Sequence, residues 1–178
     1  MQKEKNKDYF LWESFKRGDD NAFFNLYDQY VDMLLGYGLH FSKDVDLLKD
    51  CIHDLFLDLY KYRKQLSGTD NIKFYMFRSL KRKIQRELSK KSIFSSDEEG
   101  KFAFPELEPA YDDVIIMTEI KEENSELLKV AMSKLTVQQR EALFLKFEQN
   151  LGYPEIAQIQ NISVESARTN IYRAIKTL

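Results

Sequence analysis

The last 52 residues, 127–178, carry the feature that most constrains the fold, because signals for three helix starts lie close together there. Thr136 and Gln139 form the S/T-x-x-E/Q pattern of a capping box, which predicts that a helix begins at this point. Gly152 and Pro154 suit the start of a second helix, since proline in the first turn loses only an amide without a partner. The apolar residues expected to face inward are Leu143, Phe144, Phe147, Ile156, Ala157 and Ile159.

The third helix is expected over residues 164–178. Asn161 stands in the preceding turn, where asparagine tolerates a left-handed conformation, and Ser163 can cap the helix. One face would carry Val164, Ala167, Ile171, Ala174, Ile175 and Leu178. The outward face would carry Glu165, Ser166, Arg168, Thr169, Asn170, Tyr172, Arg173 and Lys176. Because such side chains can contact base edges and phosphates in a major groove, the pattern indicates a DNA-reading helix-turn-helix.

The charge of the chain is unevenly distributed, although the total is only −2. Lys and Arg set against Asp and Glu give −3 for residues 1–71, +7 for 72–96, −9 for 97–126 and +3 for 127–178. The basic excess is therefore confined to one short segment and the C-terminal unit. This distribution is expected for two nucleic-acid contacts joined by an acidic connector.

Composition argues against several other classes of protein. A chain with 43% hydrophobic and 31% charged residues is typical of soluble globular proteins, and its N-terminus lacks the apolar run of a signal peptide. No stretch approaches the roughly 20 apolar residues that cross a bilayer, so we expect a cytoplasmic protein without membrane insertion. The single cysteine, Cys51, excludes an internal disulfide, and no metal or cofactor is predicted. Catalytic motifs are absent, so we do not expect an enzyme.

The whole chain is expected to be all-α, with two small helical domains joined by a linker. The change in composition places an N-terminal domain at 8–91, an acidic linker at 92–118 and the C-terminal domain at 119–178. A short helix is expected near residues 112–117 of the linker. His40 is expected to be a loop or core histidine rather than a metal ligand.

Residues 47–60 are expected to form a helix with two different faces. Its core face would hold Leu48, Ile52, Leu55, Phe56 and Leu59. Leu57 points to the opposite side, where it is surrounded by Asp50, His53, Asp54 and Lys61. An apolar residue ringed by polar groups is typical of a protein-docking site, but single exposed leucines are also common on surfaces. The pattern alone leaves both interpretations open.

Residues 72–91 are expected to form a basic helix after a loop with turn chemistry, Ser67, Gly68, Thr69, Asp70 and Asn71. Its basic side chains, which we expect to be exposed, are Lys73, Arg78, Lys81, Arg82, Lys83, Arg86, Lys90 and Lys91. Phe74, Phe77, Leu80 and Ile84 share one side and are expected in the core rather than stacked on bases. A stripe of charged residues on a helix is often only a solvated face. In this helix, however, Glu87 is the single acidic residue among the basic ones, and this excess of positive charge favours contact with phosphates.

The combination resembles a bacterial RNA polymerase sigma factor of the extracytoplasmic-function (ECF) group. Residues 50–60, DCIHDLFLDLY, are similar to the region 2 helix of that family. Residues 135–141, LTVQQRE, and 152–157, GYPEIA, are similar to the start of its region 4. The resemblance implies that residues 8–91 are region 2 and that 119–178 are region 4. It also implies a protein that binds core RNA polymerase and directs promoter-specific initiation.

The resemblance further implies a role for each group of residues. The β′ clamp coiled coil would bind Asp50, His53, Asp54, Leu57 and Lys61, and region 4 would meet the β flap. The loop from Ser67 to Asn71 would hold a base flipped out of the −10 element, and Arg78, Lys81, Arg82, Lys83 and Arg86 would grip the DNA around it. The −35 element would be read by Arg168, Thr169 and Arg173, with Ser166, Asn170 and Tyr172 near the DNA backbone.

This sequence departs from the family pattern at two of these positions. The family often has Gln where His53 stands and Asn where Arg82 stands, so phosphate contact is the safer expectation for Arg82. An anti-sigma factor is a further family expectation. The acidic linker would run toward the path of the RNA, although its composition fits a simple tether equally well. The alternative function is a stand-alone helix-turn-helix regulator that does not depend on core polymerase.

Overall fold

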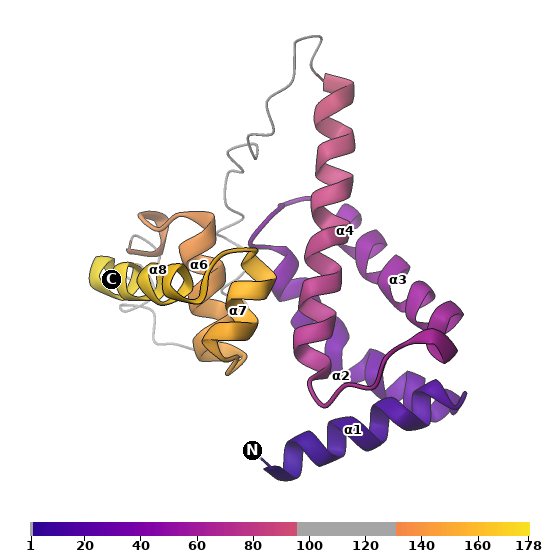
Figure 1. Ribbon diagram of the computed structural model, residues 1–178. Helices are drawn as coiled ribbons and strands as arrows, with labels where there is room; N and C mark the ends of the chain where they lie inside the picture. The colour runs from indigo at the N-terminus through magenta and orange to yellow at the C-terminus, as the bar shows by residue number, and fades with distance from the viewer. Residues whose placement is uncertain (1, 96–130) are drawn as a thin grey trace, which may run out of the picture.

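The computed structural model describes residues 2–95 and 131–178, and these residues form two groups of helices (Figure 1). The N-terminal body contains α1 (Gln2–Lys16), α2 (Asp20–Gly38), α3 (Val45–Tyr62), the 3-10 turn η1 (Arg63–Gln65) and α4 (Ile72–Ser95). The C-terminal body contains α6 (Val137–Leu143), the π-helical turn η3 (Phe144–Glu148), α7 (Tyr153–Gln160) and α8 (Val164–Thr177). The described residues contain no strand, as the all-α prediction requires. The expected helix at 112–117 and most of the linker lie outside them.

Local capping defines where the helices of the N-terminal body begin. Asp19 accepts hydrogen bonds from the backbone amides of Asn21 and Ala22, at 2.9 and 3.3 Å, and so caps α2. Asp44 caps α3 in the same way through the amide of Leu47, at 3.0 Å. Each cap satisfies an amide that the first turn of a helix leaves unpaired and contributes about 1 kcal/mol. Gly18 joins α1 to α2 with a φ of 97°, which favours glycine.

The core of the N-terminal body lies between α2, α3 and α4, and α1 crosses its lower end (Figure 1). The predicted core face of α3 is confirmed, because all five of its residues are buried. Phe77, Leu80 and Ile84 of α4 are buried as well, while Phe74 is half-buried. Burying one such side chain contributes roughly 1.5–3 kcal/mol, so this packing rather than helix propensity fixes the orientation of α3 and α4.

The helix-turn-helix has the boundaries that its local signals predict. Thr136 and Gln139 form the capping box in both directions, at 2.9 and 3.2 Å. Asn161 adopts the left-handed conformation, with φ 56° and ψ 47°, and closes α7. Ser163 then accepts a hydrogen bond from the amide of Ser166, at 3.1 Å, and caps α8.

Three residues predicted to face inward are instead exposed. Phe147 is 59% exposed because it lies in η3, where the wider π turn removes it from the face that Leu143 and Phe144 share. Ile175 and Leu178 are both 51% exposed, whereas Ala167, Ile171 and Ala174 of α8 are buried. The last turn of α8 therefore presents apolar side chains to solvent.

The two bodies pack against each other, with α7 beside α4 (Figure 1). Phe144 is the apolar centre of this contact, because its ring lies 5.9 Å from Tyr37, 5.9 Å from Phe77 and 4.9 Å from His40, measured between centroids. His40 is thus a core histidine, as predicted. Burial, and after it the nearby Arg140, lowers the pKa of His40 to about 4, so this ring is neutral at physiological pH. In the part of the chain that is described, no helix is long and apolar enough to span a membrane.

Candidate nucleic-acid interface

The outer face of α3 holds the residues predicted to dock a protein partner. Asp50, His53, Asp54, Leu57 and Lys61 are all exposed and lie on one stripe of the helix, and Leu57 is 53% exposed. Cys51, two residues before His53, is buried, and burial raises the pKa of its thiol. The two side chains therefore face different environments, as their spacing predicts.

Aromatic residues enlarge this face in a way that the sequence pattern does not reveal. Phe24 and Tyr27 of α2 and Tyr60 of α3 are large and exposed. Tyr27 lies against Phe56, with ring centroids 4.8 Å apart, so α2 adds apolar surface next to α3. In the sequence the aromatic residues Phe23, Phe24 and Tyr27 look alike, and only the packing of α2 on α3 leaves Phe23 half-buried and the other two exposed.

The loop between η1 and α4 is held in place by specific hydrogen bonds. The indole nitrogen of Trp12 in α1 donates to the backbone oxygen of Ser67, at 2.9 Å. Thr69 accepts from the amide of Asn71, at 3.1 Å, and the side chain of Asn71 accepts from the amide of Phe74, at 3.0 Å. Asn71 therefore caps α4. Ser67, Gly68 and Asp70 stay exposed, whereas Thr69 and Asn71 are half-buried.

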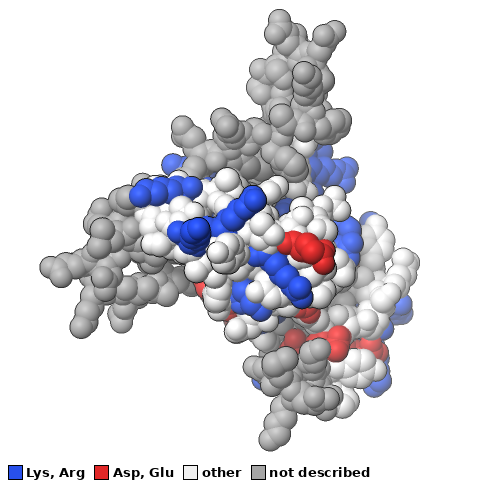
Figure 2. Space-filling view, turned by 60° about the vertical axis from the view of Figure 1, so that its left-hand side comes forward, with Lys and Arg blue, Asp and Glu red and all other residues white. Residues whose placement is uncertain are grey.

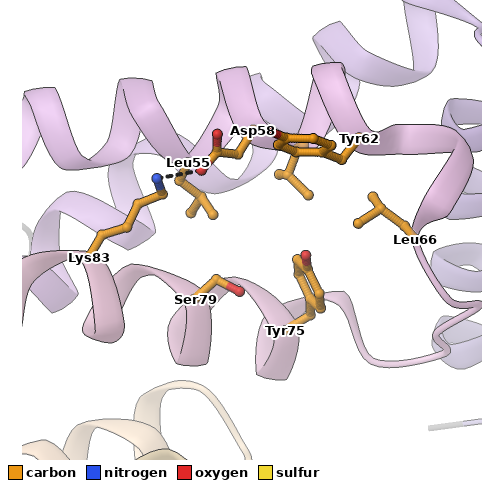
Figure 3. A pocket seen from close by; sticks show the side chains of 8 residues that line it. Leu55, Asp58, Tyr62, Leu66, Tyr75, Ser79 and Lys83 are labelled. Carbon is orange, nitrogen blue, oxygen red and sulfur yellow. Dashed lines mark hydrogen bonds and ion pairs between the residues drawn. The ribbon is translucent and has the colours of Figure 1, made fainter.

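A cavity of about 250 Å³ opens beside this loop, between α3 and α4 (Figure 3). Its lining residues are Leu55, Asp58, Leu59, Tyr62, Leu66, Tyr75, Ser79 and Lys83. The aromatic rings of Tyr62 and Tyr75 stand on opposite sides of it, and the ion pair of Lys83 with Asp58, at 2.6 Å, forms its far end (Figure 3). Burial raises the pKa of Tyr75, so its hydroxyl stays protonated. The cavity thus presents two aromatic rings together with one positive and one negative side chain. The loop residues Ser67 to Asn71 do not line it.

The basic residues of α4 do not all face solvent, contrary to the prediction. Arg82 and Arg86 are exposed, and Lys83 is half-buried against Asp58. Lys81 is only 8% exposed, because its ammonium group lies 2.8 Å from both carboxylate oxygens of Glu141 in α6. Arg78 is half-buried, with its Nη1 3.5 Å from the side-chain oxygen of Gln158 in α7. The contacts of Lys81 and Arg78 depend on the packing of the two bodies and have no local signal in the sequence.

The outer face of α8 carries the predicted DNA-reading side chains. Ser166, Arg168, Thr169, Tyr172 and Arg173 are exposed. Asn170, the remaining predicted member, is half-buried. The space-filling view shows Lys and Arg side chains gathered over the C-terminal body with few acidic ones between them (Figure 2).

Small residues on the inner face of α8 allow it to pack closely on its neighbours. The buried alanines at 167 and 174 let the helix approach α6 and α7 closely. The guanidinium group of Arg168 lies 5.4 Å from the centroid of the Tyr153 ring, at the start of α7. This cation–π contact leaves the group exposed and able to make hydrogen bonds. The geometry suits contacts with bases and phosphates. Within the described residues, no group of three or more His, Cys, Asp or Glu side chains could hold a metal ion.

Residues 125–178 match the family described as sigma-70, region 4. A search of curated proteins gave no match. CnrH, solved in complex with the cytosolic domain of CnrY, has a TM-score of 0.61 at 17% identity, over 96% of this chain and 93% of that one. The sigma factor RpoE from Bartonella quintana, solved in complex with the anti-sigma factor NepR, has a TM-score of 0.63 at 18% identity, over 87% and 92%.

The structural likeness extends over nearly the whole chain, while the sequence match is confined to the C-terminal body. Residues 125–178 therefore match a sigma-70 region 4 domain, and the chain as a whole shares its fold with CnrH and with the sigma factor RpoE.

Proposed function

We propose that this chain is a sigma factor that binds core RNA polymerase and directs initiation at specific promoters. In this proposal residues 8–91 are region 2 and residues 119–178 are region 4. The observation that carries it is the presence, in one chain, of a region 4 domain with an exposed Arg-bearing helix and an N-terminal body with a separate exposed docking face. A factor of this kind would work in the cytoplasm.

The docking face on α3 is the proposed contact with the β′ clamp coiled coil. Leu57 is exposed and ringed by charged groups, which is the composition of an interface hot spot, and the aromatic residues of α2 extend it. A protein partner would bury this apolar surface, which explains why it is kept exposed in the free chain. Region 4 would bind the β flap.

Promoter recognition would use both bodies. The exposed face of α8 would enter the major groove of the −35 element, where Arg168 and Arg173 can each pair with a guanine. Arg82 and Arg86 of α4 would hold phosphates at the −10 element.

The cavity between α3 and α4 is the proposed place for an extruded base, which would stack on the rings of Tyr62 and Tyr75. The loop from Ser67 to Asn71 would then form its rim, because Leu66 belongs to the lining. Unstacking a base costs a few kcal/mol, and a pocket that binds it only when extruded offsets that cost. Region 2 would thereby favour the open duplex without any covalent chemistry.

The competing function is that of a stand-alone regulator. Complex formation with core polymerase discriminates between a sigma factor and such a regulator. Purified chain and core enzyme are mixed and separated by size-exclusion chromatography. We expect the wild type to co-elute with core enzyme and Leu57→Asp to lose at least about tenfold in affinity, as is usual for an interface hot spot. The matched control is Phe10→Asp on α1, where the residue is 65% exposed and outside the docking face. If the wild type does not co-elute, the sigma proposal is wrong and the regulator stands.

RpoE was crystallised with an anti-sigma factor, which supports a partner of the same class for this chain. The proposal places such a partner in competition with polymerase or DNA for one of the two bodies. A partner of that kind would be recovered with the purified chain and displaced by core enzyme.

A further inference from the structure

Trp12 is the only tryptophan in the chain and is fully buried, although it lies on α1, which carries none of the residues predicted to bind polymerase or DNA. Two of its contacts lead to the proposed base pocket. Its indole nitrogen donates to the backbone oxygen of Ser67 at 2.9 Å, in the loop that would form the rim. Its ring lies 5.1 Å from that of Tyr75, measured between centroids, at an interplanar angle of 60°. One side chain therefore contacts both the rim and one wall of the cavity.

Trp12 supports the wall at Tyr75 from outside the cavity. The lining of the cavity includes Tyr75 but not Trp12, so the indole contacts the Tyr75 ring on a side that faces away from the cavity. The indole also packs against Phe15, with centroids 5.7 Å apart, and Phe15 stacks on Phe23 of α2 at 5.8 Å. Ring contacts in such geometries are favourable beyond the burial that they provide. The orientation of Tyr75 is therefore supported by rings that belong to α1 and α2.

The loop over residues 66–71 is anchored at both ends, although it forms neither helix nor strand. At its C-terminal end Asn71 caps α4. Near its N-terminal end Trp12 holds the carbonyl group of Ser67. A loop that is ordered only when a ligand binds loses conformational freedom at that moment, and this loss weakens binding. A loop that is fixed beforehand avoids most of that cost, so the bond from Trp12 favours capture of a base at the rim.

We propose that Trp12 is a positioning residue for base capture, which keeps the ring of Tyr75 and the backbone of Ser67 in the arrangement that accepts an extruded base. This inference rests on the proposed function, since it assumes that the cavity takes up a base of the −10 element. Trp12 contacts neither DNA nor polymerase in this account and acts through the two residues that it orients. Strand opening then depends on α1, whereas assembly with polymerase and recognition of the −35 element do not.

A positioning role predicts a defect that depends on the state of the DNA. On a duplex, capture of the base has to offset the cost of unstacking it, so a poorly arranged pocket shifts the balance toward the closed duplex. On a template whose −10 strands are mismatched and already open, that cost is absent. A defect of folding or of assembly would instead reduce initiation equally on both templates.

The test uses holoenzyme reconstituted from core RNA polymerase and the full chain. Wild-type holoenzyme first selects a promoter from a random library, and this promoter is prepared both as a duplex and with mismatched −10 strands. Trp12→Phe keeps an aromatic ring beside Tyr75 but removes the indole donor. The matched control is Ile52→Val, a mild substitution in the buried face of α3 at a residue that does not line the cavity. Thermal unfolding measures the stability of each variant.

We expect Trp12→Phe to lower the fraction of open duplex promoter, measured by permanganate reactivity, by about fivefold, as one lost hydrogen bond predicts. Initiation on the mismatched template should stay within about twofold of wild type. Ile52→Val should match wild type on both templates. If Trp12→Phe does not fold, benzothienylalanine at position 12 replaces it in the same assays, because this amino acid keeps the shape of the indole and lacks only its N–H group.

A second measurement needs no substitution. Because Trp12 is the only tryptophan, its indole N–H gives a single signal in the nuclear magnetic resonance spectrum of the free chain. We expect this proton to exchange with solvent at least about 100-fold more slowly than in the unfolded chain, because it is buried and bonded to Ser67. Exchange at the unfolded rate would remove the contact on which the inference rests.

Equal opening of the duplex by folded Trp12→Phe and by wild type would overturn the positioning role. A loss of the same size on both templates would also overturn it, because it would reveal a general defect of folding or assembly. The proposed function fails separately if wild-type holoenzyme selects no promoter, or if filling the cavity with Leu66→Trp leaves duplex opening unchanged. In either of these cases the base pocket is wrong, and this inference is lost with it.

Discussion

Arg168 is the residue for which sequence readout can be tested most sharply. Its side chain is exposed on α8, one turn after the cap at Ser163, and its guanidinium group lies over the ring of Tyr153. The guanidinium group of Arg168 therefore lies near the N-terminal end of the helix, which is the end that would contact bases in a major groove. Arg168→Ala removes this guanidinium group and leaves the buried face of the helix unchanged.

Arg168→Ala is expected to change two free energies by different amounts, that of DNA binding and that of folding. Loss of a bidentate contact to guanine costs roughly 1–3 kcal/mol, or about 5- to 150-fold in affinity, at one base pair only. Loss of the exposed cation–π contact with Tyr153 costs about 0.5–1 kcal/mol of folding stability, which is too little to unfold the domain. The variant should therefore stay folded and lose discrimination at a single position of the −35 element.

The assay is a competitive binding titration of holoenzyme against a library of −35 sequences, repeated at several salt concentrations. The matched control is Arg86→Ala, an exposed arginine on α4 that we expect to contact phosphate. Its loss should weaken binding to all sequences alike and reduce the salt slope by about 0.9 if it neutralises one duplex phosphate. If Arg168→Ala also weakens every sequence equally, the direct-readout argument is refuted.

Three further outcomes follow from the described geometry. Ser163→Ala removes the cap of α8 and should lower the free energy of unfolding by about 1 kcal/mol in a denaturant titration; an unchanged midpoint would show that the cap contributes nothing. Leu66→Trp, which fills the cavity between α3 and α4, should suppress strand opening in permanganate footprinting while duplex binding persists, and normal opening would place the base elsewhere. Because His40 has a folded pKa of about 4 against an unfolded value near 6.5, the unfolded state binds more protons between these pH values, so stability should fall by up to ~3 kcal/mol from pH 6.5 to 4. His40→Phe should remove most of that slope, and a wild type whose stability is flat over this range would contradict it.

Features encoded by neighbouring residues could be predicted from the sequence. The capping box at Thr136, the left-handed turn at Asn161 and the cap at Ser163 each depend on contacts within a few residues. The two faces of α3 follow from the helical period, which separates Leu57 from the buried side. These predictions are confirmed because the contacts that determine them are local, and tertiary packing does not change them.

Features that depend on distant residues could not be predicted. The burial of Lys81 requires Glu141, 60 residues away, and nothing in a basic helix marks which of its lysines will be covered. The exposure of Phe147 depends on the π turn η3, which interrupts an otherwise regular helical spacing. The cavity beside Leu66 depends on how α3 and α4 pack. Of its lining residues, only Leu55 and Leu59 were predicted to lie in the core and only Lys83 to contact DNA.

The most direct test of the central claim is transcription by core RNA polymerase supplemented with this chain alone, on a library of promoter sequences. The account predicts start sites at a limited set of sequences that share both a −35 and a −10 element. It also predicts that Leu57→Asp abolishes this output by preventing assembly. Duplex binding by the chain alone, with no specific start sites from core enzyme, would contradict the account and favour an independent regulator.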